Sequence, residues 1–330
     1  MSGRITSSMT VQGRFAVGAV SADGSDVALV PPTPAGSDAW TPVDRSSTTV
    51  VVAHPQAGST KTYRLHGNFV PEAFSTDDSG LFMLEYLPPV EPTAYRVVRL
   101  TLDKGKVEEL YGRTKGVEPP KRMAGTRLQQ IPAPDGSELY TLYTNQSPVY
   151  AKEYATETHE SGPVAFIHTL SLQDGWAYCL DLPKGFGPGP SSAKAIALSP
   201  DGTELYAVDT DRGLLAVLNT GSLKVVRSAD VAFHLPDGGQ TVASVSSDGK
   251  DLYVARGSQV ETVSLASLTT AGGWTLNGTA TGLASSEDGN RLYASTSNGL
   301  QVLDPSTGGS LRSLSLSGVS GIAYVGSTGS

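Results

Sequence analysis

The sequence predicts an all-β fold in which four-stranded blades repeat around an axis, the β-propeller. Three observations predict it. One turn motif recurs along the chain, each copy lies between short apolar runs, and the later copies are 40 to 50 residues apart. The chain also holds 37 glycines among 330 residues, which suits a fold with many short strands and turns.

An Asp-Gly pair followed by Leu-Tyr marks each strong copy of the repeat. The strong copies are 133–145, 199–211, 246–258 and 286–298, and weaker ones are 21–32 and 75–87. Asp-Gly favours the positive φ of a tight hairpin, so the apolar runs on either side read as paired strands. We therefore expect positive φ in the turn glycines and equivalent interblade places for the leucines that follow them. The glycines are Gly136, Gly202, Gly249 and Gly289, and the leucines are Leu139, Leu205, Leu252 and Leu292.

The chain ends bear on the number of blades. Six repeats are complete, and residues 319–325 read as a further innermost strand while residues 5–11 read as an outermost one. We expect a single propeller domain over residues 1–330, with an incomplete seventh blade formed from the two ends. A six-bladed ring is the alternative. A β-sandwich fits less well, because sandwiches do not repeat one turn motif six times.

Composition and scattered residues exclude several function classes. The formal net charge is −8 with no dominant basic patch, which argues against a nucleic-acid partner. No apolar run reaches the ~18 residues of a membrane span, so we expect no membrane insertion by this segment. The five histidines form no local ligand motif, and no phosphate loop or nucleophile elbow is present, so we expect no metal and no cofactor. His168 and Cys179 lie in apolar runs and read as core residues.

Strand order predicts which face of the propeller carries a site. Connections between second and third strands and between blades share one face, and every long insertion falls in these connections. Tyr86, Tyr95 and Phe186 are expected to rim a depression there, together with Tyr150 and Tyr154. The residues expected to bind a ligand or partner near the central opening are Tyr86, Arg127, Glu72, Glu85, Tyr143 and Arg14. No catalytic residue is assigned.

The repeats SPDGTELYAVD and SSDGKDLYVAR resemble those of bacterial YVTN-type and WD-like propellers. Residues 71–89 and 166–183 are similar to stretches of actinobacterial WD-like repeat proteins. The resemblance implies a propeller fold and an extracytoplasmic location, at the cell surface or membrane-anchored, with a cytoplasmic location as the alternative.

The leading functional expectation is a non-enzymatic recognition or scaffold propeller. It would bind an unidentified protein or small-molecule ligand on its loop-rich face. The alternative is a lactonase-like hydrolase with its site in the central pocket, because the YVTN family includes lactonase-like members. An acid/base pair within hydrogen-bond reach, with perturbed pKa values, would favour the enzyme.

Overall fold

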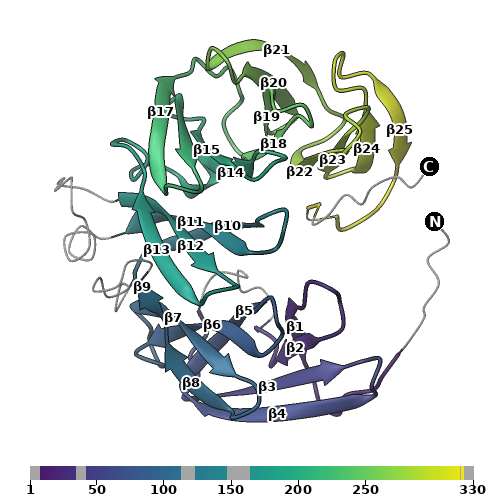
Figure 1. Ribbon diagram of the computed structural model, residues 1–330. Coiled ribbons are helices and arrows are strands. Elements are labelled where there is room, and N and C mark those ends of the chain that lie inside the picture. Colours follow the sequence, from purple (N-terminus) through teal and green to yellow (C-terminus); the bar gives the residue numbers. More distant parts are fainter. Residues whose placement is uncertain (1–7, 35–41, 113–122, 147–163, 320, 323–330) are drawn as a thin grey trace.

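The computed structural model describes residues 8–34, 42–112, 123–146, 164–319 and 321–322. Within these residues the strands form six four-stranded antiparallel sheets that follow one another around an axis in chain order (Figure 1). Each sheet is one blade, and its four antiparallel strands run in sequence order from the axis outward; one sheet carries a short fifth strand at its outer edge. The predicted propeller is therefore confirmed, with six blades.

The first three blades use the longer strands. Blade one holds β1 (Ala16–Val20), β2 (Val27–Val30), β3 (Ser47–His54) and β4 (Ser59–His66). Blade two holds β5 (Asn68–Phe74), β6 (Gly80–Leu87), β7 (Ala94–Thr101) and β8 (Lys106–Glu109). Blade three holds β10 (Thr126–Pro132), β11 (Glu138–Gln146), β12 (Val164–Ser171) and β13 (Trp176–Asp181), with the short β9 (Tyr111–Gly112) pairing parallel to β13.

The last three blades have short connections within each blade. Blade four holds β14 (Lys194–Leu198), β15 (Glu204–Asp209), β16 (Leu214–Asn219) and β17 (Lys224–Asp230). Blade five holds β18 (Val242–Val245), β19 (Asp251–Arg256), β20 (Gln259–Ser264) and β21 (Thr269–Thr275). Blade six holds β22 (Ala280–Ser285), β23 (Leu292–Thr296), β24 (Gly299–Leu303) and β25 (Ser310–Leu314). The described residues hold one helical turn, η1 (Ser191–Ala193), and no helix that could cross a bilayer.

The repeated turn has the predicted backbone conformation. It is also closed by hydrogen bonds between a serine hydroxyl and the turn aspartate, a Ser–Asp pair that we call the staple. Gly136, Gly202, Gly249 and Gly289 have φ between 71° and 74°, which confirms the prediction. In blade four the Ser199 hydroxyl donates to Asp201 Oδ1 at 2.6 Å and accepts a hydrogen bond from the backbone N–H of Glu204 at 2.9 Å. The same Ser–Asp contact recurs in blades one, two, five and six, so each of these hairpins is closed by one hydroxyl and one carboxylate.

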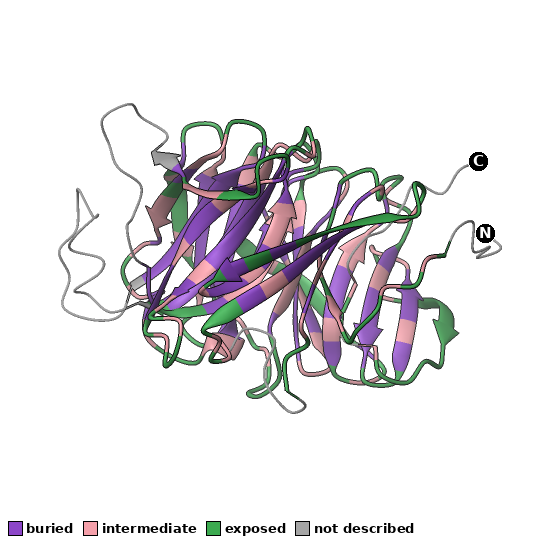
Figure 2. Ribbon diagram, turned by 90° about the horizontal axis from the view of Figure 1, so that it is seen from below, coloured by how far each residue is buried: buried purple, intermediate pink, exposed green. Residues whose placement is uncertain are grey.

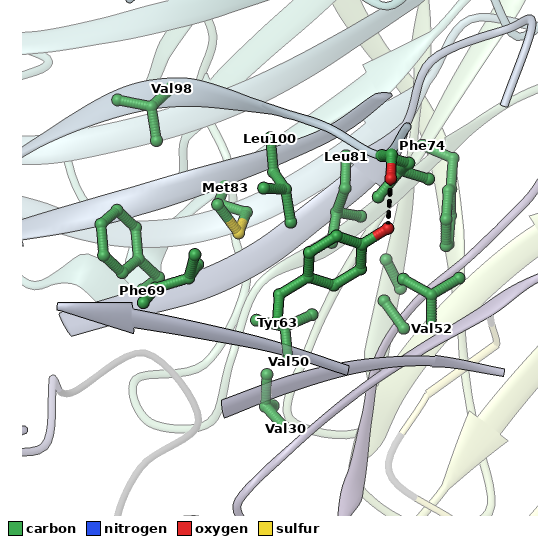
Figure 3. Packing of buried hydrophobic residues seen from close by; sticks show 14 residues of the cluster. Val30, Val50, Val52, Tyr63, Phe69, Phe74, Leu81, Met83, Val98 and Leu100 are labelled. Atoms are coloured by element: carbon green, nitrogen blue, oxygen red, sulfur yellow. Dashed lines mark hydrogen bonds between the residues drawn. The ribbon is translucent and has the colours of Figure 1, made fainter. Parts of the chain in front are cut away.

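Apolar cores fill the junctions between successive blades. Five clusters of buried residues correspond to the five junctions from blade one to blade six. Figure 2 shows buried and exposed residues alternating along the strands, and Figure 3 shows Leu81 and Met83 of blade two packed toward Val50 and Tyr63 of blade one. The four repeat leucines face the preceding blade at four successive junctions and are at most 5% exposed, as predicted.

The predicted seventh blade is not confirmed. Residues 8–15 contain no strand, and neither do the described residues between 315 and 322. The remaining parts of the two predicted end strands lie outside the described residues. Figure 1 shows an opening between the strands of blade six and those of blade one.

Candidate functional site

The first polar cluster on the axial side of the blades joins blades two and three. Arg127 Nη1 lies 2.5 Å from Glu72 Oε1, and these side chains are only 7% and 3% exposed. Glu72 falls in a β-bulge, because the register of β5 against β6 shifts between Pro71 and Ala73. A bulge re-aims the side chains of a strand. Here the carboxylate of one innermost strand meets the guanidinium of the next.

Gln130 supports the carboxylate from the same neighbouring strand. Its Nε2 donates to Glu72 Oε2 at 3.0 Å and to Thr141 Oγ1 at 3.3 Å. Both oxygens of Glu72 are thus engaged by blade three, one by a cation and one by an amide. The sequence offered no signal for Gln130, because a glutamine in a strand is common and its contact depends on the blade-to-blade packing.

Aromatic rings enclose the ion pair. Tyr95 stacks on Tyr143 with ring centroids 5.2 Å apart, and Tyr143 stacks on Phe166 at 5.1 Å. Tyr86 meets Tyr95 edge to face at 6.0 Å, and the His168 ring meets Tyr143 in the same way at 6.4 Å. All five rings belong to blades two and three, so the pair lies in an aromatic environment with little access to water.

Burial shifts the titration of this cluster. It raises the pKa of Glu72 above its usual range, although the Arg127 charge opposes the change. Burial also raises the pKa of Tyr86 to about 12 and, with the Arg127 charge, lowers the pKa of His168 to about 4. Arg127 stays a cation: burial lowers its pKa, but the Glu72 carboxylate together with the neighbouring tyrosines raises it overall. At neutral pH the site therefore presents a cation, a carboxylate that holds a proton more readily than usual, a neutral imidazole and protonated phenols.

Four of the six predicted site residues meet here, and two do not. Glu72, Arg127, Tyr86 and Tyr143 form the cluster. Glu85 lies on the opposite side of the blade-two sheet, where it accepts a hydrogen bond from Arg96 Nε at 2.6 Å. Neighbouring residues of a strand face opposite sides, so Glu85 cannot join Tyr86. Arg14 is exposed on the segment before β1.

The predicted aromatic rim is wrong for the residues that the structure describes. Tyr86, Tyr95 and Phe186 are 7%, 6% and 2% exposed, because their rings pack into the cores between blades. Tyr150 and Tyr154 lie outside the described residues. His168 is a buried residue as predicted, at 3% exposure, and Cys179 is half-buried with its sulfur 3.6 Å from that of Met123.

A second buried charge cluster joins blades four and five at the loop-rich end. Lys194 Nζ lies 3.3 Å from Asp209 Oδ2 and donates to the carbonyls of Pro188 and Pro190 at 3.0 and 3.2 Å. Arg256 reaches from blade five to Asp211 of blade four. The Lys194 ammonium donates two hydrogen bonds to carbonyls of the connection before β14, and its charge lies beside the Asp209 carboxylate. This arrangement fastens that connection to the blade.

Comparison with known proteins gives structural neighbours only. No family model matches the chain, and no curated protein matches its sequence. A putative 6-phosphogluconolactonase from Bacteroides fragilis superposes with a TM-score of 0.49 and 16% identity over 91% of this chain and 84% of its own. The periplasmic gluconolactonase of Pseudomonas aeruginosa gives 0.48 and 21% over 90% and 83%. The β-propeller domain of Cps50 (Swd1) from Myceliophteria thermophila gives 0.45 and 16% over 93% and 87%.

These neighbours correct the leading functional expectation. That expectation was a non-enzymatic recognition or scaffold propeller, whereas lactonases are prominent among the neighbours that span most of this chain. At such low identities the likeness shows the fold alone, so any activity has to be argued from the residues of the site.

Proposed function

We propose that this protein is a lactonase-like hydrolase that opens a cyclic ester, with Glu72 and Arg127 at the centre of its site. The observation that carries the proposal is the buried Glu72–Arg127 pair, in which a carboxylate of raised pKa lies 2.5 Å from a guanidinium. Ester hydrolysis needs a base for the attacking water and a positive group for the oxyanion. The cluster supplies both within one hydrogen-bond distance.

In the proposed reaction Glu72 first accepts a proton and later returns it, while Arg127 stabilises negative charge. Glu72 takes a proton from water as the water oxygen bonds to the lactone carbonyl carbon. Arg127 stabilises the negative charge that develops on the carbonyl oxygen. The ring C–O bond then breaks, and the proton returns from Glu72 to the leaving oxygen, which gives a hydroxy acid. Tyr86 holds its proton up to about pH 12 and so can donate a hydrogen bond to the substrate at neutral pH.

Burial sets a condition on this chemistry. The Arg127 and Glu72 side chains are 7% and 3% exposed, so a substrate can reach them only when the surrounding side chains open. The low polarity that this cover provides has a use, because it strengthens the electrostatic contacts inside the site. We expect the opening of the cover to limit the rate for bulky lactones.

The test is hydrolysis of glucono-1,5-lactone, the class of compound that the neighbours' names suggest, followed as acid release in a pH-stat against the uncatalysed rate. We expect turnover by the unaltered protein and a loss of about 10² or more in Glu72→Gln, which keeps the shape but removes the base. Arg127→Lys should also lose most activity, because lysine cannot reproduce the guanidinium geometry.

A matched control comes from the second buried pair. Asp209→Asn removes one charge from an equally buried lysine–carboxylate pair, and we expect its activity to stay within about twofold of the unaltered protein. Activity no greater than the uncatalysed rate would overturn the proposed function. Activity that survives Glu72→Gln would leave a hydrolase but move its site elsewhere.

The cellular location and the relationship to YVTN-type and actinobacterial WD-like propellers are separate proposals. The resemblance to YVTN-type repeats supports an extracytoplasmic location. Fractionation of cells that carry the natural gene, with detection by an antibody, tests this. Recovery of the protein in the cytoplasmic fraction alone would contradict it.

A further inference from the structure

Two asparagines of this chain are followed by glycine, and the fold brings them together. Asn277 lies in the connection between β21 of blade five and β22 of blade six, and Asn298 lies in the hairpin between β23 and β24. Both are exposed, and Asn298 Nδ2 donates to Asn277 Oδ1 at 3.1 Å. Asparagine is chemically labile, because the backbone nitrogen that follows it can attack its side-chain amide. A following glycine hinders this attack least, since it has no Cβ.

Residue 278 has to be glycine in this fold. Gly278 has a φ of 109°, and an added Cβ would lie 2.9 Å from Ser297 Oγ and 3.0 Å from Asn298 Nδ2. No larger residue can therefore protect Asn277 without distorting the neighbouring hairpin. The Gly278 nitrogen lies in a bend between strands and donates to the carbonyl of Leu276 at 3.1 Å. The attack requires this hydrogen bond to open.

The glycine of the second pair is held more firmly. Gly299 is the first residue of β24 and pairs with Thr296 across the hairpin. It is buried, and an added Cβ would overlap the carbonyl oxygen of Leu314 on β25. The nitrogen of Gly299 is thus fixed between two strands, whereas that of Gly278 is not. We expect attack on Asn298 to be the slower of the two reactions.

The contact between the two amides favours attack on Asn277 in a second way. The hydrogen bond from Asn298 Nδ2 to Asn277 Oδ1 draws electrons away from the Asn277 amide carbon. The same donor stabilises the negative charge that develops on this oxygen as the nitrogen attacks.

We propose that Asn277 is a self-modification site, at which the chain converts its own asparagine to aspartate or isoaspartate. The Gly278 nitrogen bonds to Asn277 Cγ, its proton passes to the side-chain amide, and ammonia leaves, so that a succinimide ring forms. Water then adds to one of the two ring carbonyls, whose bond to nitrogen breaks while the nitrogen takes up a proton. Opening on one side gives aspartate, and opening on the other gives isoaspartate, in which the backbone runs through the former side chain.

Isoaspartate would loosen the connection between blades five and six. Gln301, which is 6% exposed, accepts a hydrogen bond from the Asn277 N–H at 3.1 Å and donates one to the Asn277 carbonyl at 2.9 Å. Isoaspartate places an additional methylene in the backbone between these two groups, so Gln301 cannot hold both. A buried amide that loses a partner destabilises the folded state. The modified protein should therefore melt at a lower temperature.

The first test incubates the full chain in mildly alkaline buffer and follows each asparagine by peptide mapping with mass spectrometry. We expect deamidation at Asn277 to be about fivefold faster than at Asn298, the effect of one hydrogen bond on a rate. Asn290 is exposed and followed by arginine, so it serves as the internal control. Faster reaction at Asn298, or a rate at Asn277 no greater than that at Asn290, would overturn the proposal.

Two variants separate the roles of the two asparagines. Asn298→Ala should slow deamidation of Asn277 about fivefold, and an unchanged or faster rate would refute the role of the Asn298 donor. Asn277→Gln keeps an amide, but its longer side chain disfavours ring closure. We expect the modified fraction of the unaltered protein to melt about 2 °C lower after incubation, while Asn277→Gln keeps its initial melting temperature. Equal losses in the two proteins would place the damaging reaction elsewhere in the chain.

Discussion

Blades two and three differ from blades four and five in how they place their buried charges. In blades two and three, β5 and β10 are both bulged, and Glu72 of the first bulge reaches Arg127 of the next innermost strand. In blades four and five, β14 and β18 pair without a bulge, and Lys194 pairs with Asp209, its direct neighbour on β15. The Lys194–Asp209 pair thus stays within one regularly paired blade, whereas the bulge in β5 aims Glu72 across a junction.

We interpret the charges of blades four and five as structural and the pair in blades two and three as the candidate site. Lys194 and Asp209 of blade four are also met by backbone groups, and the Pro188 and Pro190 carbonyls that Lys194 binds tie down a connecting segment. The pair in blades two and three is surrounded by rings and by one amide. Bulges are over-represented next to active sites, and perturbed pKa values cluster at functional positions. Three of the four predictions below compare a residue of blades two and three with a counterpart in blade five, and one compares blade four with blade five.

The largest difference should come from removing a buried cation. Arg127→Met leaves the Glu72 carboxylate buried without its partner, and we expect a loss of about 3–5 kcal/mol in the free energy of unfolding. Arg256→Met should cost less, because its partner Asp211 is 26% exposed and water can replace the cation. Urea denaturation of both variants measures this. Equal losses would mean that the two charge clusters are equally sealed.

The sequence predicts the regular features of this fold well because each depends on a few adjacent residues. The Asp-Gly turns fix their own φ angles, and period-2 alternation places Leu205 and Leu252 between blades. The serine that closes the turn, as at Ser199 and Ser246, is also visible in the sequence two residues before the aspartate, except in the third blade, where Ala133 precedes Asp135.

The site was only partly predictable, because it depends on contacts between distant segments. Glu72 and Arg127 stood out as charges on apolar strands, but their pairing needs the bulge and the stacking of two blades. Glu85 was placed wrongly because the position of a residue near a strand end does not tell which side of the sheet it faces. Tyr86 was expected at the surface, and only the packing of blade three over it explains its burial.

A core substitution tests whether the two halves are equally well packed. Leu139 of blade three and Leu252 of blade five hold equivalent places, at 5% and 0% exposure. Truncation to alanine should cost about 3 kcal/mol at Leu252, within the usual range for a buried leucine, and somewhat less at Leu139. Thermal unfolding of both variants gives the comparison. A larger loss at Leu139 would mean that the irregular half is the more tightly packed one.

A turn substitution separates backbone strain from crowding. Gly202 and Gly249 have nearly equal φ, 74° and 71°, so alanine should cost about 1 kcal/mol at either through its left-handed backbone. At Gly202 the new methyl would also lie 2.9 Å from Pro134 Cδ of blade three, while at Gly249 it meets nothing within 4 Å. Gly202→Ala should therefore be the less stable variant by chemical denaturation. The reverse order would show that Pro134 moves freely, and that the junction between blades three and four is loose at this end.

The smallest effect concerns the staple carboxylates, because the Ser–Asp turn has the same arrangement in blade two and in blade five. The Ser75 hydroxyl and other donors lower the pKa of Asp77 to about 2, while Lys250, followed by Ser246, lowers that of Asp248 to about 2. Both lie below the usual 3.8, so each ionised carboxylate stabilises the folded state above about pH 4, and this contribution is lost as the pH falls through about 2.

Asparagine keeps the Oδ1 acceptor but does not titrate. The advantage of the unaltered protein over Asp77→Asn and Asp248→Asn should thus be small near pH 6 and vanish near pH 2, as melting temperatures will show. Lys250 Nζ lies 2.9 Å from Asp248 Oδ2 at the surface, so high salt should reduce the advantage at Asp248 more than at Asp77, whose nearest donors are neutral hydroxyls. Equal sensitivity to salt at the two turns would mean that the lysine contributes nothing and that the hydroxyl staple alone holds both hairpins.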